Sequence, residues 1–159
     1  MTAPAKRYTA EAFDAFVAQP ENEEKLFEFI GGEIVEVPSN PYSSEIAAEI
    51  SFFIKLYLRE SGMEGHVTGE QGGYQVGEER YAPDVAYLSK AVQPQLARTG
   101  YNPNPPQLAV EVVSPTDSER NLMIKMGNYL AVGTVVWIVY SAEQEVHVYV
   151  PGQAVTVLT

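Results

Sequence analysis

The sequence predicts an α/β (α+β) domain in which helices flank a mixed central sheet. Its 159 residues, 45% of them hydrophobic, suffice for one compact domain, so we expect residues 1–159 to form a single domain. Segments with helical spacing of apolar residues alternate with short strand-like runs along the chain. Residues 108–113 are almost wholly apolar, which is typical of a central strand covered on both faces.

The chain opens with a predicted N-terminal helix and β-hairpin. Thr9 is a suitable N-cap for a short helix at residues 10–18. Residues 27–37 contain two strand-like runs around Gly31 and Gly32, a pair that tolerates the positive φ angles of a tight turn. We therefore expect a β-hairpin at residues 27–37.

The longest amphipathic helix is predicted at residues 43–60, where one apolar stripe recurs at helical spacing. The stripe consists of Ile46, Ile50, Phe53, Ile54 and Tyr57. Residues 66–76 predict a strand pair or one long bent strand, because several glycines mark a turn or bulge within them.

The second half predicts a strand–loop–strand–helix order. Residues 83–88 form a short strand, residues 90–106 a long loop, and either Asp117 or Ser118 can cap a helix that runs through Ala131. Three further strands are expected at residues 135–140, 146–150 and 155–158.

Charge and composition exclude several functions. The net charge is −11, and 15 of the 21 acids precede residue 81, which argues against non-specific attraction to nucleic acid but not against a site where a metal ion supplies positive charge. The absence of cysteine and the presence of only two histidines exclude disulfides, thiolate sites and multi-histidine zinc sites. No apolar run is long enough for a membrane span and the N-terminus lacks a signal-peptide pattern, so we expect a cytoplasmic protein.

Glu111 is the most informative residue because it lies within the apolar run at residues 108–113. An ionised carboxylate there costs several kcal/mol unless a cation or hydrogen-bond donors compensate. The alternatives are a Glu111 side chain that faces water and one that pairs with an arginine. The position therefore predicts a functional acid with a cation beside it.

Three further residues are candidates for the same site. Asp84 follows Pro83 at the start of a strand, although turn-forming aspartates are common beside proline. Lys125 lies at the boundary of the apolar stripe of its helix, where its ammonium either reaches water or enters a cleft beside the sheet. Glu49 has a matching boundary position on the first long helix, and Glu45 is turned further outward.

Together these residues suit metal-dependent hydrolysis. Two strand carboxylates can hold one Mg²⁺, with water and a backbone carbonyl completing the oxygen ligands. A lysine can orient the attacking water and neutralise developing negative charge. Alternatively, the acids simply pair with Lys125 or Arg120 as a buried ion pair, and the residues alone do not specify DNA.

Several segments resemble the Uma-type restriction endonuclease family, long catalogued as a domain of unknown function within the PD-(D/E)xK nuclease superfamily. The resemblance extends from about residue 8 to residue 150. The matching segments are residues 26–36, 83–85, 108–115, Lys125 with Tyr129, and Gly133 with 137–139.

The resemblance implies a restriction-endonuclease-like fold and hydrolysis of phosphodiester bonds in DNA. Asp84 and Glu111 would be the two strand acids, and Lys125 would replace the usual lysine, whose position Val113 occupies. Glu49 would match a helical glutamate near the metal, and the ion, Mg²⁺ or Mn²⁺, would bind at Asp84, Glu111 and Val113.

The resemblance also implies DNA as the partner. Because the acidic surface opposes DNA binding, we expect a homodimer in which each active site faces a shared groove, and the short apolar runs predict no membrane partner. The interface would lie at residues 102–106 or at a tyrosine-rich surface. The alternative function is a non-catalytic or regulatory interaction protein that retains the nuclease fold.

Overall fold

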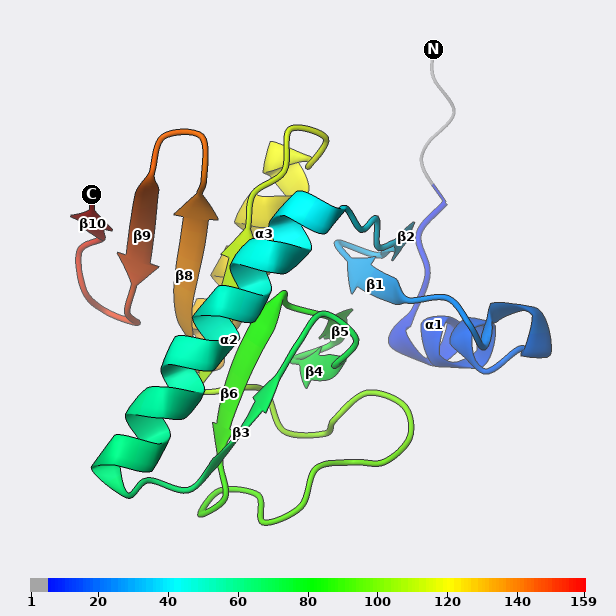
Figure 1. Cartoon of the computed structure of the whole chain (residues 1–159). Helices are drawn as coiled ribbons and strands as arrows, with labels where there is room; N and C mark the ends of the chain where they lie inside the picture. Colours follow the sequence, from blue (N-terminus) through cyan, green and yellow to red (C-terminus); the bar gives the residue numbers. More distant parts are fainter. Residues whose placement is uncertain (1–5) are drawn as a thin grey trace.

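A computed structural model describes residues 6–159 and shows a mixed α/β fold (Figure 1). The helices are α1 (Ala10–Val17), α2 (Pro41–Ser61) and α3 (Glu119–Ala131), with a 3-10 turn η1 (Pro20–Asn22). The strands are β1 (Phe27–Ile30), β2 (Glu33–Glu36), β3 (Gly65–Thr68), β4 (Tyr74–Val76), β5 (Glu79–Tyr81), β6 (Val85–Ser89), β7 (Leu108–Val112), β8 (Val135–Tyr140), β9 (Glu145–Tyr149) and β10 (Thr156–Leu158).

The strands form two sheets. The larger sheet has the order β10-β9-β8-β7-β6-β3. In this sheet β7 pairs with β8 in parallel, and all other neighbouring strands pair antiparallel. The smaller sheet, β2-β1-β5-β4, is antiparallel throughout. The mixed central sheet flanked by helices is therefore confirmed, and the hairpin belongs to the second sheet rather than to the first.

The side chains of β7 alternate between the two faces of the larger sheet. Ala109 packs in the cluster that contains Tyr129 of α3, whereas Val110 and Val112 pack with Ala47 of α2. Because successive strand residues point to opposite faces, α2 and α3 cover opposite sides of the sheet. The prediction of a doubly covered β7 is thus confirmed, and Glu111 falls on the α3 side.

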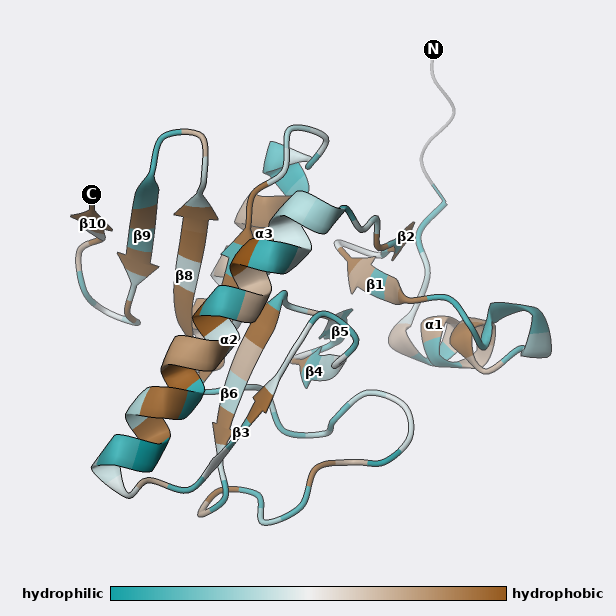
Figure 2. Cartoon of the chain, viewed as in Figure 1, coloured by the Kyte–Doolittle hydropathy of each residue, from teal (hydrophilic) through white to brown (hydrophobic). Residues whose placement is uncertain are grey.

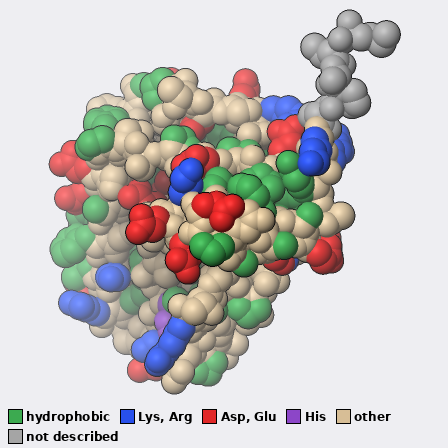
Figure 3. Space-filling view, turned by 90° about the vertical axis from the view of Figure 1, so that its right-hand side faces the viewer, with side chains coloured by type: hydrophobic (Ala, Val, Ile, Leu, Met, Phe, Trp, Pro, Cys, Tyr) green, Lys and Arg blue, Asp and Glu red, His purple; other side chains and the backbone are tan. Residues whose placement is uncertain are grey.

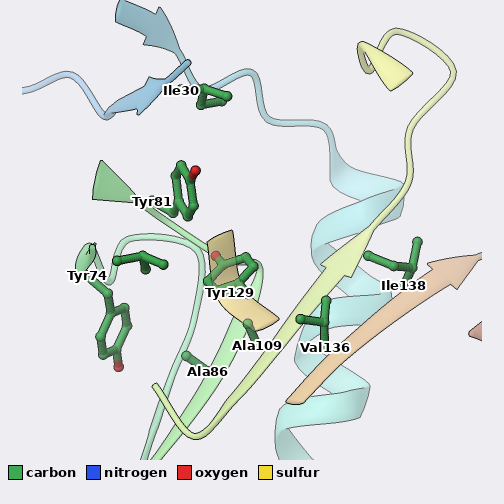
Figure 4. Packing of buried hydrophobic residues seen from close by; sticks show 9 residues of the cluster. Ile30, Tyr74, Tyr81, Ala86, Ala109, Tyr129, Val136 and Ile138 are labelled. Atoms are coloured by element: carbon green, nitrogen blue, oxygen red, sulfur yellow. The ribbon is translucent and has the colours of Figure 1, made fainter. Parts of the chain in front are cut away.

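The smaller sheet packs on the same side as α3. Tyr74 and Tyr81 of this sheet share one buried cluster with Tyr129, and the rings of Tyr81 and Tyr129 meet edge to face at 5.2 Å between centroids. Figure 4 shows these aromatic residues close to Ala109 of the larger sheet. Aromatic packing therefore fixes the hairpin sheet above the centre of the larger one.

The N-terminal predictions agree with the structure. Thr9 caps α1 by accepting a hydrogen bond from the Ala12 amide at 3.1 Å. Gly31 and Gly32 join β1 to β2 with φ angles of 59° and 83°, which explains why glycine is needed at this turn. Ser118, rather than Asp117, is the cap of α3.

Helix α2 differs from the prediction in its start and in its buried face. It begins at Pro41 and is capped by Asn40, because proline is compatible with the first turn of a helix. Phe53 and Tyr57, predicted to be buried, are 61% and 62% exposed. The helix instead places Ile46, Ala47, Ile50 and Ile54 against the sheet.

The segment predicted as a strand pair at residues 66–76 is divided between the two sheets. β3 is the edge of the larger sheet next to β6, and β4 is the edge of the smaller sheet next to β5. The glycine-containing residues 69–73 carry the chain from one sheet to the other, so residues 66–76 form neither of the predicted alternatives, a strand pair or one long bent strand. The prediction also missed β5, which is only three residues long.

The long loop at residues 90–106 is partly tied into the molecule. Asn102 is buried and exchanges side-chain hydrogen bonds with Gln93, and its backbone pairs with Gly73 and Gln75. Asn102 and Pro106 of the predicted interface at residues 102–106 are therefore buried within the chain, whereas Pro103 and Asn104 are exposed. Within residues 6–159, no helix combines the length and apolarity needed to cross a bilayer.

Candidate active site

A cavity of about 280 Å³ lies where the hairpin, the start of α2, the C-terminal end of β7 and helix α3 meet. Asp84, Glu111 and Lys125 all line this cavity. They come from three separate elements: the turn before β6, the centre of the sheet, and the middle of α3. The fold thus brings together three of the four residues that the sequence singled out.

Glu111 and Lys125 form a buried ion pair. The Lys125 Nζ lies 2.7 Å from Glu111 Oε1, and the two residues are only 7% and 8% exposed. The Tyr129 hydroxyl, one turn later on α3, donates to the same Glu111 oxygen at 3.2 Å. The boundary position of Lys125 therefore directs its ammonium into the cavity rather than to water.

Glu28 is a third member of this cluster that the sequence interpretation missed. Its Oε1 lies 2.7 Å from the Lys125 Nζ and also accepts a hydrogen bond from the Ala82 amide at 2.9 Å. Glu28 is buried on β1, whose four residues are all buried. Lys125 is thus held between one acid of each sheet.

Asp84 is anchored to the adjacent strand. Its Oδ2 accepts a hydrogen bond from the Val112 amide at 2.7 Å, directly after Glu111 in β7. Pro83 is buried immediately before it, which fixes the backbone at the entry to β6. This contact holds the Asp84 carboxylate beside the residue that follows Glu111.

Each of the three acids keeps one oxygen without a protein partner. Within residues 6–159, Asp84 Oδ1, Glu111 Oε2 and Glu28 Oε2 accept no hydrogen bond, whereas their other oxygens are occupied. No fully buried polar side-chain atom in that range lacks a partner, so these three oxygens are open to the cavity. The cavity wall therefore presents unsatisfied carboxylate oxygens.

Negative charge exceeds positive charge in the cluster, since three carboxylates surround one ammonium. Burial, reinforced by Glu28, raises the pKa of Asp84 to about 6, against the opposing effects of the Val112 amide and Lys125. Burial also raises the pKa of Glu111, and Glu28 and Asp84 add to this while Lys125 opposes it. The two acids at 2.7 Å raise the pKa of Lys125 despite its burial. Lys125 is therefore protonated. A further cation in the cavity would stabilise the ionised forms of Asp84 and Glu111, whose pKa values are raised.

More acids line the rim of the cavity, namely Glu36, Glu70 and Asp117. The space-filling view in Figure 3 likewise shows acidic side chains gathered near the middle of one face of the molecule, with basic surface among and below them. Such a surface attracts cations and repels phosphate groups unless cations are bound.

Glu49 does not join the site. It is exposed on α2 and is absent from the cavity lining, and the same holds for Glu45. The reason is the alternation along β7, because α2 packs on the face of Val110 and Val112 whereas Glu111 points to the opposite face. The matching boundary positions on the two helices therefore lie on opposite sides of the sheet.

The donor set suits a small divalent cation. Two open carboxylate oxygens from Asp84 and Glu111 lie in one cavity with Val113, and hard oxygen donors are the ligands that Mg²⁺ prefers. Within residues 6–159, no group of three or more histidine, cysteine, aspartate or glutamate side chains is arranged to hold a metal. Mg²⁺ commonly retains several waters and uses one or two carboxylates, so the residues fit Mg²⁺ better than an ion that needs an all-protein cage.

The signal that identified Glu111 also applies to Glu28. Glu28 stands between Phe27 and Phe29 in a short apolar run, so it is an acid within a buried strand. The hairpin pattern concealed it, because alternation predicts one polar face, whereas both faces of β1 are covered. Arg120, the other basic partner considered, forms no salt bridge with these acids in the described part of the chain.

The comparisons with known proteins concern the fold and the family of the chain. The fold is similar to the crystal structure of a protein from Anabaena variabilis ATCC 29413 described as a putative nuclease belonging to DUF820. The TM-score is 0.77 at 24% sequence identity, over 94% of this chain and 83% of that one. No curated protein matches the chain. The model of the Uma2 family, described as "Putative restriction endonuclease", matches residues 13–159, and the chain therefore belongs to that family.

Proposed function

We propose that the protein is a metal-dependent endonuclease that hydrolyses phosphodiester bonds in DNA. The main support is the cavity in which open oxygens of Asp84 and Glu111 lie beside the buried ammonium of Lys125. Family membership and the nuclease-like fold support the same reaction class. We treat residues 1–159 as one restriction-endonuclease-like domain that acts in the cytoplasm.

Asp84 and Glu111 would hold Mg²⁺ or Mn²⁺ through their open oxygens, with the backbone carbonyl of Val113 as a third ligand. A bound ion of this kind activates water and stabilises charge on a phosphate. The Val112 amide and the Tyr129 hydroxyl occupy the remaining oxygens, so each carboxylate is oriented before the ion binds. The protein contributes orientation at both carboxylates.

Lys125 would act on the substrate side of the same cavity. Its ammonium orients the attacking water and compensates the negative charge that develops on the phosphate. Glu28 is a positioning residue, because its contacts with Lys125 and the Ala82 amide fix the lysine stem without blocking the other acids. The pairing with two acids keeps Lys125 charged at neutral pH.

DNA binding by so acidic a chain depends on cations. The net charge of −11 and the acidic rim oppose contact with the phosphate backbone. Divalent ions at the cavity reduce that repulsion where the scissile phosphate must enter. We therefore expect DNA binding, as well as DNA cleavage, to require the divalent ion. We also propose that the protein is a homodimer.

A second candidate is a non-catalytic interaction protein that retains the nuclease fold. The direct pairing of Lys125 with Glu111 favours it, because a buried ion pair can serve structure alone. The excess of acids over bases and the open oxygens favour the nuclease instead.

Plasmid cleavage separates the two functions. Purified protein is incubated with supercoiled DNA with and without Mg²⁺ or Mn²⁺, and nicked and linear products are measured for wild type, Glu111→Gln and Lys125→Met. We expect metal-dependent cleavage by wild type and none by either variant. Glu79→Gln is the matched control, since Glu79 is a partly buried acid outside the cavity lining.

Cleavage that persists in both site variants would reject the site. Absence of cleavage by wild type, together with an unchanged melting temperature on addition of either ion, would favour the non-catalytic candidate.

A further inference from the structure

The outward face of α2 carries large apolar side chains that no part of the described chain covers. Phe52, Phe53, Leu56 and Tyr57 are 57%, 61%, 37% and 62% exposed. Phe52 and Leu56 lie on the outermost side of the helix, whereas Phe53 and Tyr57 lie on its flank, about 100° and 140° around the helix from Phe52. The rings of Phe52 and Phe53 lie 5.3 Å apart between centroids. Figure 1 shows α2 across the outside of the larger sheet with no element in front of it. Exposed aromatic clusters of this kind mark contact surfaces.

On this face, acidic residues lie in one half of α2 and basic residues lie in the other half. Glu45 and Glu49 lie in the N-terminal half of α2, and Lys55 and Arg59 lie in the C-terminal half. All four are exposed, and none takes part in a salt bridge within residues 6–159. In Figure 2, α2 has hydrophilic residues toward both ends and a hydrophobic stretch between them.

These residues form a stripe that is symmetric about Phe52. At about 100° per residue, the stripe lies within about 60° of Phe52 around the helix. It consists of Glu45, Ala48, Glu49, Phe52, Lys55, Leu56 and Arg59. The spacing of three and four residues is the same in both directions from Phe52, which is the pattern of a helix-packing seam.

We propose that α2 is the interface for a second copy of this chain, packed antiparallel across a two-fold axis at Phe52. In this arrangement Phe52 meets its own copy, and the small Ala48 lies opposite Leu56 of the second copy. Such an interface is self-complementary, as a two-fold axis requires.

The same arrangement pairs every charge on the stripe with an opposite charge. Glu45 lies opposite Arg59 of the second copy, close to the middle of the seam. Glu49 and Lys55 of the second copy lie at the same level along the helices, and their long side chains meet across the seam. A parallel arrangement would instead place acid against acid and base against base. The charges therefore select the antiparallel register as well as the partner.

The exposed acids on the stripe also argue against DNA as the occupant, since Glu45 and Glu49 would face phosphate groups. The proposal does not depend on nuclease activity. Because Asn40 and Ser43 at the start of α2 line the cavity, antiparallel pairing places the two cavities of the dimer at opposite ends of the helix pair.

Sedimentation velocity of the full chain over a range of concentrations tests the proposal. Wild type should approach twice the chain mass of 17.5 kDa. Phe52→Glu should dissociate at least ten-fold more readily, and circular dichroism should show that it remains folded, because the side chain is already exposed. Met123→Glu is the control, since Met123 is an exposed apolar residue of α3, at 54%.

Charge reversal tests the register. The double variants Glu45→Lys/Glu49→Lys and Lys55→Glu/Arg59→Glu should each be monomeric, and an equimolar mixture of the two should form a heterodimer. A monomeric wild type at 100 µM, on the order of a weak dimer's Kd, would overturn the proposal. A dimer that survives Phe52→Glu, or a mixture that fails to associate, would also overturn it, whatever the outcome of the cleavage assay.

Discussion

Two polar clusters lie on either side of Tyr81, and they differ in how their acids are satisfied. In the first, Glu79 accepts hydrogen bonds from the Gly31 amide, the Tyr81 hydroxyl and the Asn128 amide group, so both of its oxygens are occupied by neutral donors. In the second, Glu28 and Glu111 share Lys125, Asp84 accepts a hydrogen bond from the Val112 amide, and each of the three acids retains an open oxygen. The first cluster is complete without a ligand, whereas the second leaves room for a cation.

The number of hydrogen-bond donors around each acid distinguishes structural acids from functional ones. Glu79 ties the hairpin turn to α3 and β5, and its surroundings supply as many donors as it needs. The cavity cluster concentrates like charges in a buried place, which costs stability unless another positive charge arrives. Burial alone does not distinguish the clusters, but the balance of donors and acceptors does.

Substitution of Glu111 and substitution of Glu79 should affect activity and stability in opposite ways, and this contrast is the largest effect that we expect. Glu111→Gln should reduce DNA cleavage on the order of 10³-fold, as the loss of a group acting at the reaction centre does, with little change in melting temperature. Glu79→Gln should leave cleavage within about three-fold of wild type. Its melting temperature should fall on the order of 5 °C, because a buried donor loses its partner.

Cleavage kinetics and thermal unfolding of both variants measure this contrast. Equal losses of activity, or an unstable Glu111→Gln beside an unchanged Glu79→Gln, would contradict the division into two kinds of cluster.

Lys125→Met should lower both activity and stability, with a pH dependence that Glu79→Gln lacks. The change keeps most of the side-chain volume but leaves Glu28 and Glu111 facing each other without a cation. Cleavage should fall about 100-fold, and stability should fall by about 3 kcal/mol at pH 10, well above the raised pKa of Glu111, where the acids are ionised. At pH 5 the loss should be smaller, since raised pKa values let the acids protonate. Urea unfolding at the two pH values checks this, and an equal loss at both would contradict it.

Glu28→Gln should have a smaller effect on cleavage, because it changes the position of the Lys125 ammonium and not the metal ligands. The amide retains the shape of the side chain but weakens its hold on the ammonium. We expect an approximately ten-fold lower kcat with metal affinity unchanged, the range typical for a residue that orients a catalytic group. Titration with Mn²⁺ beside steady-state kinetics separates the two quantities. A loss of metal affinity equal to the loss of kcat would make Glu28 a ligand instead.

Asp84 should give the smallest effect, a pH dependence of stability in the metal-free protein. Its pKa is about 6 in the folded chain against an ordinary value of 3.8, so the folded state retains a proton that the unfolded state releases first. The contribution of Asp84 to stability should therefore fall as pH rises from about 4 to about 6 and change little above that. Asp84→Asn should remove this part of the slope in thermal unfolding. A wild-type slope of the opposite sign, or one unchanged by Asp84→Asn, would contradict the raised pKa.

The sequence predicted the site better where burial was visible in the local pattern. Glu111 stood out because its neighbours on both sides are apolar, and Lys125 was placed at the edge of a buried stripe. Glu49 was misplaced because a helix alone does not reveal which face of the sheet it covers. Glu28 was overlooked because the second sheet that buries β1 includes β5, which is too short to recognise.

The fold shows the same limit. The order of helices and the central position of β7 follow from apolar periodicity, which is a local property. The division of residues 66–76 between two sheets depends on pairing with strands distant in sequence. Phe53 and Tyr57 were expected in the core because apolar residues surround most of α2, and only packing against the sheet decides which side is buried.

Direct measurement of Mn²⁺ binding by calorimetry, in buffers of different ionisation enthalpy, tests the central claim that the cavity acids are arranged to bind a divalent cation. Wild type should bind the ion and release protons on binding, because the pKa values of Asp84 and Glu111 are raised. Asp84→Asn and Glu111→Gln should abolish this binding, while Glu79→Gln should retain it. Binding that is equally strong in all four proteins, or absent from wild type, would contradict the account.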